Sequence, residues 1–345
     1  MAKQILVGGV AVGGGAPVTI QSMTNTLTSD VEATVAQIQQ LQSAGCEIVR
    51  VAVPDRQAAH AIGEIKRAIS IPLVADIHFD YRLALESVAA GADKIRINPG
   101  NIGDESRVKA VADACKAKGV PIRVGVNGGS LEQNLLKKYG GVTAEALVES
   151  ALGHIARLNR FDFDDICVSL KSSSVPLTMA AYRLMAERCD YPLHLGVTEA
   201  GTVHMGTIKS AIGIGGLLAM GVGDTLRVTL TADPVEEIYV ARDILKAVGL
   251  RREGPDLIAC PTCGRTRIDL IPLAQEVERR LQGVTKPITV AVMGCAVNGP
   301  GEASAADVGI AGGIGEGLLF QKGKIVKKVP QDALVEELFH LIDQL

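Results

Sequence analysis

Residues 73–97 read LVADIHFDYRLALESVAAGADKIRI and contain one complete strand–helix–strand pattern. The apolar, β-branched run at 73–77 predicts a buried strand, and the run at 94–97 predicts another. Between them, the amphipathic stretch at 81–90 follows an acidic residue and predicts a helix. This unit decides the fold because the same alternation recurs along most of the chain.

The alternation extends over residues 17–247. The predicted strands lie at 18–21, 48–52, 73–77, 94–97, 122–126, 166–170, 193–197 and 226–230. The predicted helices lie at 31–44, 56–69, 81–90, 104–118, 143–159, 177–188, 204–220 and 234–247. Eight strand–helix units favour an α/β fold with a closed (β/α)₈ barrel, or TIM barrel, over an open doubly wound sheet. The glycines at 13–15 precede the first strand, so a dinucleotide-binding turn is poorly supported.

A second, smaller domain is predicted after the barrel. The polar sequence Arg-Arg-Glu-Gly-Pro at 251–255 is typical of a domain boundary, which gives domains at 1–250 and 251–345. The second domain has predicted helices at 270–282 and 331–343 and predicted strands at 288–293, 307–311, 317–321 and 324–328. These elements indicate a small α+β unit.

Composition excludes several classes of partner. The 345 residues are 47% hydrophobic, and their net charge of −3 provides no electrostatic field that would attract nucleic acid. With no Trp, five Tyr and five Phe, side chains that could stack on bases are also scarce. The longest apolar stretch, 210–223, is shorter than the ~20 residues that span a bilayer. The N-terminus lacks a secretory pattern, and four of the seven cysteines are scattered singly, at 46, 115, 167 and 189. We therefore expect a cytoplasmic protein with no membrane or nucleic-acid partner.

The other three cysteines predict a metal centre. Cys260 and Cys263 form a CxxC pair, and Cys295 supplies a third thiolate from a distant segment. Glu302 follows three turn-forming residues, at 299–301, that could fold its carboxylate back toward the metal. An iron–sulfur cluster would make the chain an electron-transfer protein. The spacing also allows a structural zinc site, or a CxxC redox pair with an unrelated third cysteine.

Charged residues within the barrel strands predict a second site, because functional groups gather where barrel strands end. The cations are Arg50, Arg96, Arg123, Lys171 and Arg227, and Lys209 is expected to open the seventh helical segment. Other polar residues close the strands: Asp76, His78, Asn98, Asn127, Thr198 and Glu199. So many cations indicate a multiply charged anion such as a diphosphate. The alternative, pairing of each Arg with an internal carboxylate, is limited by the small number of carboxylates; His78 is either a proton donor or a hydrogen-bonded core residue.

Seven motifs together resemble the 4-hydroxy-3-methylbut-2-en-1-yl diphosphate synthases. In chain order they are QSMTNT at 21–26, VADIHFD at 74–80, RINPGNIG at 96–103, TEAG at 198–201, GDTLR at 223–227, ACPTC at 259–263 and NGPGE at 298–302. The resemblance implies the bacterial two-domain form, a barrel followed by a reductase-like domain with a [4Fe-4S] cluster. It also implies reductive ring opening and dehydration of 2-C-methyl-D-erythritol 2,4-cyclodiphosphate in the non-mevalonate isoprenoid pathway, with two electrons from flavodoxin or ferredoxin.

The resemblance also implies roles for individual residues. The cluster ligands would be Cys260, Cys263, Cys295 and Glu302. The diphosphate-binding groups would be Arg50, Arg96, Arg123, Asn127, Lys171 and Arg227, with Thr229 keeping a hydroxyl where the family often has Ser. The remaining polar pocket would be Asp76, His78, Thr198 and Glu199, of which His78 and Glu199 would supply protons or orient the substrate. Glu302 would leave iron more readily than a thiolate and so open a site for a substrate oxygen.

The resemblance further implies a homodimer in which the cluster of one subunit caps the barrel of the other. Two rival functions remain at this stage. The first is a non-catalytic, zinc-stapled barrel that binds a phosphorylated ligand. The second is a phosphosugar aldolase or isomerase with Lys171 as a Schiff-base lysine, which borohydride trapping would reveal.

Overall fold

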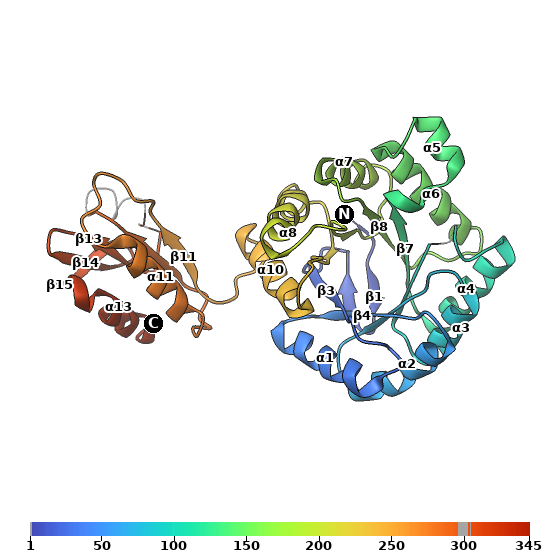
Figure 1. Ribbon diagram of the computed structural model, residues 1–345, viewed down its shortest axis with the longest axis horizontal. Coiled ribbons are helices and arrows are strands. Elements are labelled where there is room, and N and C mark those ends of the chain that lie inside the picture. Colours follow the sequence, from blue (N-terminus) through green and yellow to red (C-terminus); the bar gives the residue numbers. More distant parts are fainter. Residues whose placement is uncertain (1, 99, 296–302, 304) are drawn as a thin grey trace. The chain divides into compact units, whose positions relative to one another are not determined.

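The structure is a computed structural model that describes residues 2–98, 100–295, 303 and 305–345 (Figure 1). The chain divides into two compact units, Met1–Arg251 and Arg252–Leu345. Each unit has its own hydrophobic core. No helix in the described part of the chain is long and apolar enough to cross a membrane.

The first unit is built on a ring of eight parallel strands. They are β3 (Thr19–Met23), β4 (Ile48–Ala52), β5 (Leu73–Asp76), β6 (Lys94–Ile97), β7 (Ile122–Asn127), β8 (Ile166–Lys171), β9 (His194–Leu195) and β10 (Thr225–Leu226). Strand β10 pairs with both β3 and β9, and a bridge between Val168 and Leu193 joins β8 to β9. The predicted (β/α)₈ barrel is therefore confirmed.

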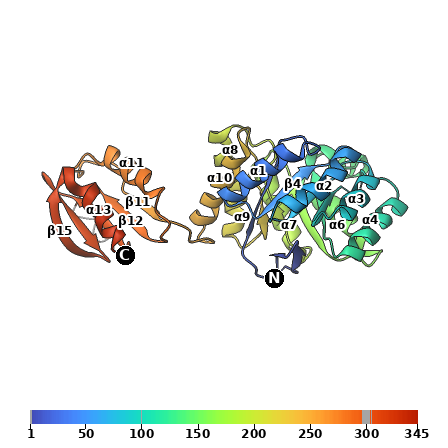
Figure 2. The same cartoon turned by 90° about the horizontal axis from the view of Figure 1, so that it is seen from below.

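Helices surround the ring (Figures 1 and 2). They are α1 (Val31–Ala44), α2 (Arg56–Ala68), α3 (Tyr81–Ala89), α4 (Glu105–Lys118), α5 (Gln133–Tyr139), α6 (Ala144–Asn159), α7 (Val175–Ala186), α8 (Val203–Ser210), α9 (Gly216–Ala219) and α10 (Pro234–Ala247). Several begin where a side chain caps a free backbone N–H, as Asp30, Asp55 and Asp104 do. These caps explain why the sequence marked the helix starts well.

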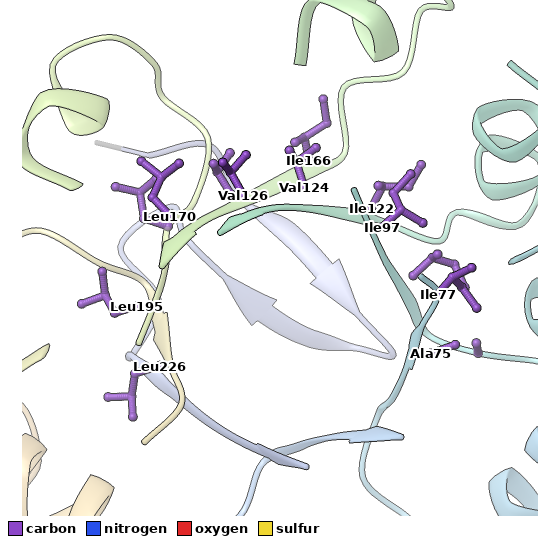
Figure 3. Packing of buried hydrophobic residues seen from close by; sticks show 14 of the residues in the cluster. Ala75, Ile77, Ile97, Ile122, Val124, Val126, Ile166, Leu170, Leu195 and Leu226 are labelled. Atoms are coloured by element: carbon purple, nitrogen blue, oxygen red, sulfur yellow. The ribbon is translucent and has the colours of Figure 1, made fainter. Parts of the chain in front are cut away.

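The apolar core lies between the strands and the helices, outside the ring. Figure 3 shows Ile122, Val124 and Val126 of β7 pointing away from the barrel centre, as do Ile166 and Leu170 of β8. Successive side chains of a strand face opposite sides, so the residues between these point into the barrel. This alternation directs the charged residues of the strands inward.

Three features differ from the sequence prediction in the barrel. The helix expected at 204–220 is divided into α8, a π-helical turn at Ala211–Gly215 and α9. The strands expected at 193–197 and 226–230 are only the two residues each of β9 and β10. Helix α5 and the π turn were not predicted, because a seven-residue helix and a glycine-rich turn carry little periodic signal.

An antiparallel hairpin, β1 (Ile5–Val7) and β2 (Val10–Val12), was also missed. Its turn is Gly8-Gly9, and both glycines have the positive φ that a two-residue hairpin turn requires. Its apolar residues pack against Ile48, Val74 and Cys167, which lie near the starts of their strands. The hairpin therefore closes the amino-terminal end of the barrel, where Figure 2 shows it, and leaves the carboxyl end for a site.

The second unit contains one five-stranded sheet. Its strands are β11 (Asp256–Ala259), β12 (Thr289–Met293), β13 (Val308–Gly312), β14 (Glu316–Gln321) and β15 (Lys324–Pro330). The first three are parallel, and the last two add as antiparallel neighbours. Helices α11 (Leu270–Leu281) and α13 (Leu334–Asp343) share one apolar cluster with the sheet. The small α+β unit is confirmed, with β11 as an unpredicted edge strand.

Candidate active site

A polar cavity of about 180 Å³ opens among the carboxyl ends of the barrel strands. The residues that line it are Arg50, Asp76, His78, Arg96, Arg123, Asn127, Ser169, Lys171, Thr198, Arg227 and Thr229. All of them except Ser169 were predicted site residues. Ser169 could have been found from alternation, because it lies two residues before Lys171 on β8 and so faces the same side.

Three predicted polar residues lie outside this lining. Glu199 is exposed and has a φ of 52°, a left-handed backbone conformation that turns it out of the strand direction. Asn98 is buried and accepts a hydrogen bond from the Gly100 N–H at 3.0 Å. Lys209 lies in the last turn of α8 rather than at its start, so it is not one of the cations that converge on the cavity.

Asp76 is the carboxylate of the cavity and bridges two arginines. Its Oδ1 lies 3.1 Å from Nη1 of Arg96, and its Oδ2 lies 3.6 Å from Nε of Arg50. Burial alone would raise the pKa of Asp76, but the positive charges of Arg50, Arg96 and Arg123 outweigh it and lower the pKa to about 2. Asp76 is therefore ionised at neutral pH and holds both guanidinium groups in place.

Glu237 of α10 is a second interior carboxylate that the sequence did not reveal. It is buried, and its two oxygens lie 3.3 and 3.4 Å from Nε and Nη2 of Arg227. It also accepts the Leu230 N–H at 3.0 Å. Met23 of β3 provides an uncharged contact, because its sulfur accepts N–H groups of Arg50 at 2.9 and 3.1 Å.

Positive charge nevertheless exceeds negative charge in the cavity. Among the described lining residues, five carry Arg or Lys side chains and one carries a carboxylate. Burial lowers the pKa of Arg123 to about 10 and lowers the pKa of Lys171 well below its usual value, with neighbouring arginines adding to the effect on Lys171. Nε and Nη1 of Arg123 have no hydrogen-bond partner within the described residues. A ligand with several negative charges would complement this arrangement.

Asn at position 76 is expected to destabilise the protein. Asp76→Asn removes the charge that compensates two buried arginines and should lower the free energy of unfolding by about 3 kcal/mol at pH 7. Because the folded-state pKa is depressed, the contribution of Asp76 is present above its ordinary pKa of 3.8 and is lost as pH falls toward 2. Urea unfolding of both proteins should therefore show a difference that is constant from neutral pH to about pH 5 and shrinks below pH 4. A constant difference down to pH 3 would contradict this account.

The second site lies at the carboxyl ends of β11 and β12. These strands are parallel neighbours with Ala259 opposite Val292, so Cys260 and Cys295 both follow strand ends on the same side of the sheet, its carboxyl-terminal side. The Gly294 N–H donates to Sγ of Cys260 at 3.0 Å. The loop that carries Cys263 is tied to this side of the sheet, because the Arg267 N–H donates to the Gly294 carbonyl at 2.9 Å.

The donor set suits a sulfur-ligated metal centre. Cys263 is exposed, and hydrogen bonds from Arg265 lower the pKa of its thiol, which favours the thiolate. By contrast, burial raises the pKa of Cys46 and of Cys115 to about 12, as expected for inert core thiols. Glu302 lies outside the described residues. Within the described part of the chain, no three His, Cys, Asp or Glu side chains are already grouped to hold a metal ion.

Fold and site together define a two-domain protein that has a strongly cationic cavity in its barrel and three cysteines near the carboxyl ends of two strands in its second domain. Residues 2–242 match the GcpE TIM-barrel domain, and residues 256–344 match the GcpE protein C-terminal domain. The chain therefore belongs to the GcpE family.

Similar proteins from several bacteria carry one name, 4-hydroxy-3-methylbut-2-en-1-yl diphosphate synthase (flavodoxin). The one from Ruminiclostridium cellulolyticum is 60% identical over 99% of this chain and 97% of its own length. The one from Caldanaerobacter subterraneus subsp. tengcongensis is 60% identical over 100% of this chain and 97% of its own. The family to which the motifs pointed is thus confirmed.

Among solved structures, dihydropteroate synthase from Stenotrophomonas maltophilia is similar in fold. It covers 71% of this chain and 97% of its own, with a TM-score of 0.52 and 14% identity. At that identity the likeness concerns the barrel fold alone.

Proposed function

We propose that this chain is a flavodoxin-dependent 4-hydroxy-3-methylbut-2-en-1-yl diphosphate synthase. It would open the ring of 2-C-methyl-D-erythritol 2,4-cyclodiphosphate and release water, with the uptake of two electrons and, for fully protonated phosphates, two protons. The observation that carries the proposal is the cavity, whose described lining residues include five cationic side chains and one carboxylate. The names of relatives 60% identical over nearly the whole chain support the same reaction.

The barrel residues would bind and orient the diphosphate. Arg50 and Arg96 are fixed by Asp76, and Arg227 is fixed by Glu237, so these guanidinium groups are already aligned before a ligand arrives. Arg123 and Lys171 add charge that no carboxylate among the described lining residues balances. The remaining lining groups, which would hydrogen-bond phosphate or hydroxyl oxygens, are Asn127, Ser169, Thr198 and Thr229.

His78 and Glu199 are the proposed proton donors. His78 lines the cavity directly, next to Asp76 on the same strand end. Glu199 follows Thr198 but is exposed in this structure, so it would need to turn toward bound substrate to act. Either residue could deliver a proton to the departing oxygen, which leaves as water.

The second domain would hold a [4Fe-4S] cluster through Cys260, Cys263 and Cys295, with Glu302 as the fourth ligand. Three cysteines on one side of the sheet match the sulfur donors that such clusters use. Such a cluster, when bound, would relay one at a time the two electrons that reduced flavodoxin provides. The Gly294 N–H at Sγ of Cys260 is the kind of contact that tunes a cluster's potential.

Turnover by the purified protein tests the proposed function. Anaerobic protein with reduced flavodoxin should convert the cyclic diphosphate into the allylic diphosphate, identified by mass spectrometry. A protein that contains zinc and binds the cyclic diphosphate without converting it would instead be a non-catalytic barrel that binds a phosphorylated ligand and is stabilised by zinc.

We further propose that the active form is a cytoplasmic homodimer. Met205, Ile208 and Ile212 are each 39–53% exposed and are spaced three and four residues apart, which places them along one side of α8 and the turn that follows. An exposed apolar stripe of this kind is typical of a protein interface. Ile212→Glu is expected to give monomers in sedimentation, whereas Glu at exposed Tyr239 of α10 should leave the dimer intact. A fully active wild-type monomer would reject the dimer.

A further inference from the structure

Two inward-facing barrel positions have no side chain, and each lies under a cation of the cavity. Gly125 is on β7 between Val124 and Val126, which point outward (Figure 3). Gly196 directly follows Leu195, the outward-facing last residue of β9 (Figure 3). By alternation both glycines face the barrel interior, where a side chain would otherwise stand.

The side chain of Arg96 occupies the space above Gly125. A Cβ added to Gly125 would lie 2.8 Å from Nε, 3.1 Å from Nη2 and 3.3 Å from Cζ of Arg96. Non-bonded heavy atoms of this kind are comfortable only at about 3.5–4.0 Å. Arg96 comes from strand β6, which lies between β5 and β7. Its Nη1 hydrogen-bonds Asp76 of β5, while Nε and Nη2 lie against Gly125 of β7.

Lys171 uses Gly196 in the same way. A Cβ at Gly196 would lie 2.6 Å from Nζ and 2.9 Å from Cε of Lys171, and 3.0 Å from the carbonyl oxygen of Arg227. Lys171 is the last residue of β8, and Gly196 directly follows β9, the next strand in the chain. Here too, a cation lies against a glycine of the strand segment that follows its own. The arrangement occurs twice in the lining, with a different cation each time.

We propose that Gly125 and Gly196 are positioning residues that determine where Arg96 and Lys171 present their charge to a diphosphate. The inference rests on the proposed function and deepens it, because it identifies residues that touch no ligand yet shape the anion site. A methyl group at either position does not remove the cation. The methyl group displaces the charged end of Arg96 or Lys171, both of which are flexible side chains, so the barrel can still fold. The displaced charge then no longer lies where it would contact the diphosphate.

The matched variants are Gly125→Ala, Gly196→Ala and a control, Gly153→Ala. Gly153 lies on the exposed side of α6, and an added Cβ there would meet no atom of the described residues within 4 Å. Calorimetric titration with inorganic diphosphate reports the anion site without the cluster or turnover. We expect the two cavity variants to bind at least 10-fold more weakly, the loss of about one charge-assisted hydrogen bond, and the control to bind like the wild type. Thermal unfolding should show that all three remain folded.

A double-mutant cycle separates positioning from general damage. If Gly125 acts through Arg96, then Gly125→Ala should change diphosphate binding little in an Arg96→Met background. An equal loss in both backgrounds, or wild-type binding by Gly125→Ala, would overturn the inference. Should Gly196→Ala fail to fold because of the nearby Arg227 carbonyl, Gly125→Ala carries the test, since the three atoms nearest to its added Cβ belong to one flexible side chain, that of Arg96. If the wild type binds neither inorganic diphosphate nor the cyclic diphosphate, the proposed function itself fails.

Discussion

Replacing Lys171 with methionine is expected to lower kcat/KM for the cyclic diphosphate by about 100-fold or more. The ammonium group lines the cavity and is nearly fully buried, so its loss removes charge-assisted hydrogen bonds that water cannot replace. Methionine has similar length and no charge, which keeps the packing. The measurement is steady-state kinetics with reduced flavodoxin under anaerobic conditions.

The same substitution is expected to leave the protein as stable as the wild type or more stable. Burial and the charges of Arg123, Arg50 and Arg227 lower the pKa of Lys171, which means that the folded state disfavours its charged form. The unfolded chain then binds more protons between the depressed folded-state pKa and the ordinary value of 10.5, so wild-type stability should rise with pH in that window. Lys171→Met should show a smaller rise, because burial also lowers the pKa of Lys94, to about 8, and the variant keeps that lysine.

A control on the barrel surface is Lys109→Met. Lys109 is exposed on α4 and pairs with Asp113 at 2.6 Å, an interaction worth little in water. It should change neither kinetics nor stability by much. Wild-type activity in Lys171→Met would show that the buried cation takes no part in binding the substrate.

Replacing Cys263 with serine is expected to remove most of the iron and all measurable turnover. Cys263 is exposed and its thiol pKa is lowered by Arg265, so its thiolate is available to a cluster, and serine is a much poorer ligand for iron. Iron and sulfide analysis of anaerobic protein, with visible absorption, measures the effect. The barrel should remain folded, because Cys263 belongs to the other unit.

Cys189→Ser provides the matched control. Cys189 is only partly buried, and burial raises the pKa of its thiol, which is the opposite of a ligand's environment. This variant should keep its iron and its activity. If Cys263→Ser retained its iron, or if Cys189→Ser lost as much iron, the assignment of Cys263 as a cluster ligand would be contradicted.

The barrel was predictable because its physical signals are local. Period-two strands, amphipathic helices and caps such as Asp30 and Asp104 appear in neighbouring residues, and the position of the cations at strand ends follows from the topology. Alternation would also have identified Ser169. Strands β1 and β2 have only three residues each, too few for a period to show, and β11 is an edge strand whose residues are largely exposed and so carry no clear apolar pattern.

Other parts of the site depend on contacts that the sequence does not encode locally. Glu236 and Glu237 are adjacent acids in the first turn of α10. Helical periodicity puts Glu237 on the apolar face with Ala241, but only the folded barrel shows that it reaches Arg227. Glu199 was predicted to face the cavity because it follows the seventh strand. Its positive φ turns the backbone at that point, and the side chain is exposed. The closeness of Gly125 to Arg96 likewise involves two strands and emerges only from the folded barrel.

The central claim is that one chain combines a diphosphate-binding barrel with a redox-active cluster. The most direct test is the iron, sulfide and zinc content of anaerobically purified protein, together with its spectrum before and after adding the cyclic diphosphate and a strong reductant. The account predicts about four irons and four sulfides per chain and a spectrum that changes when substrate binds. Stoichiometric zinc in a colourless protein that does not transform the substrate would contradict it.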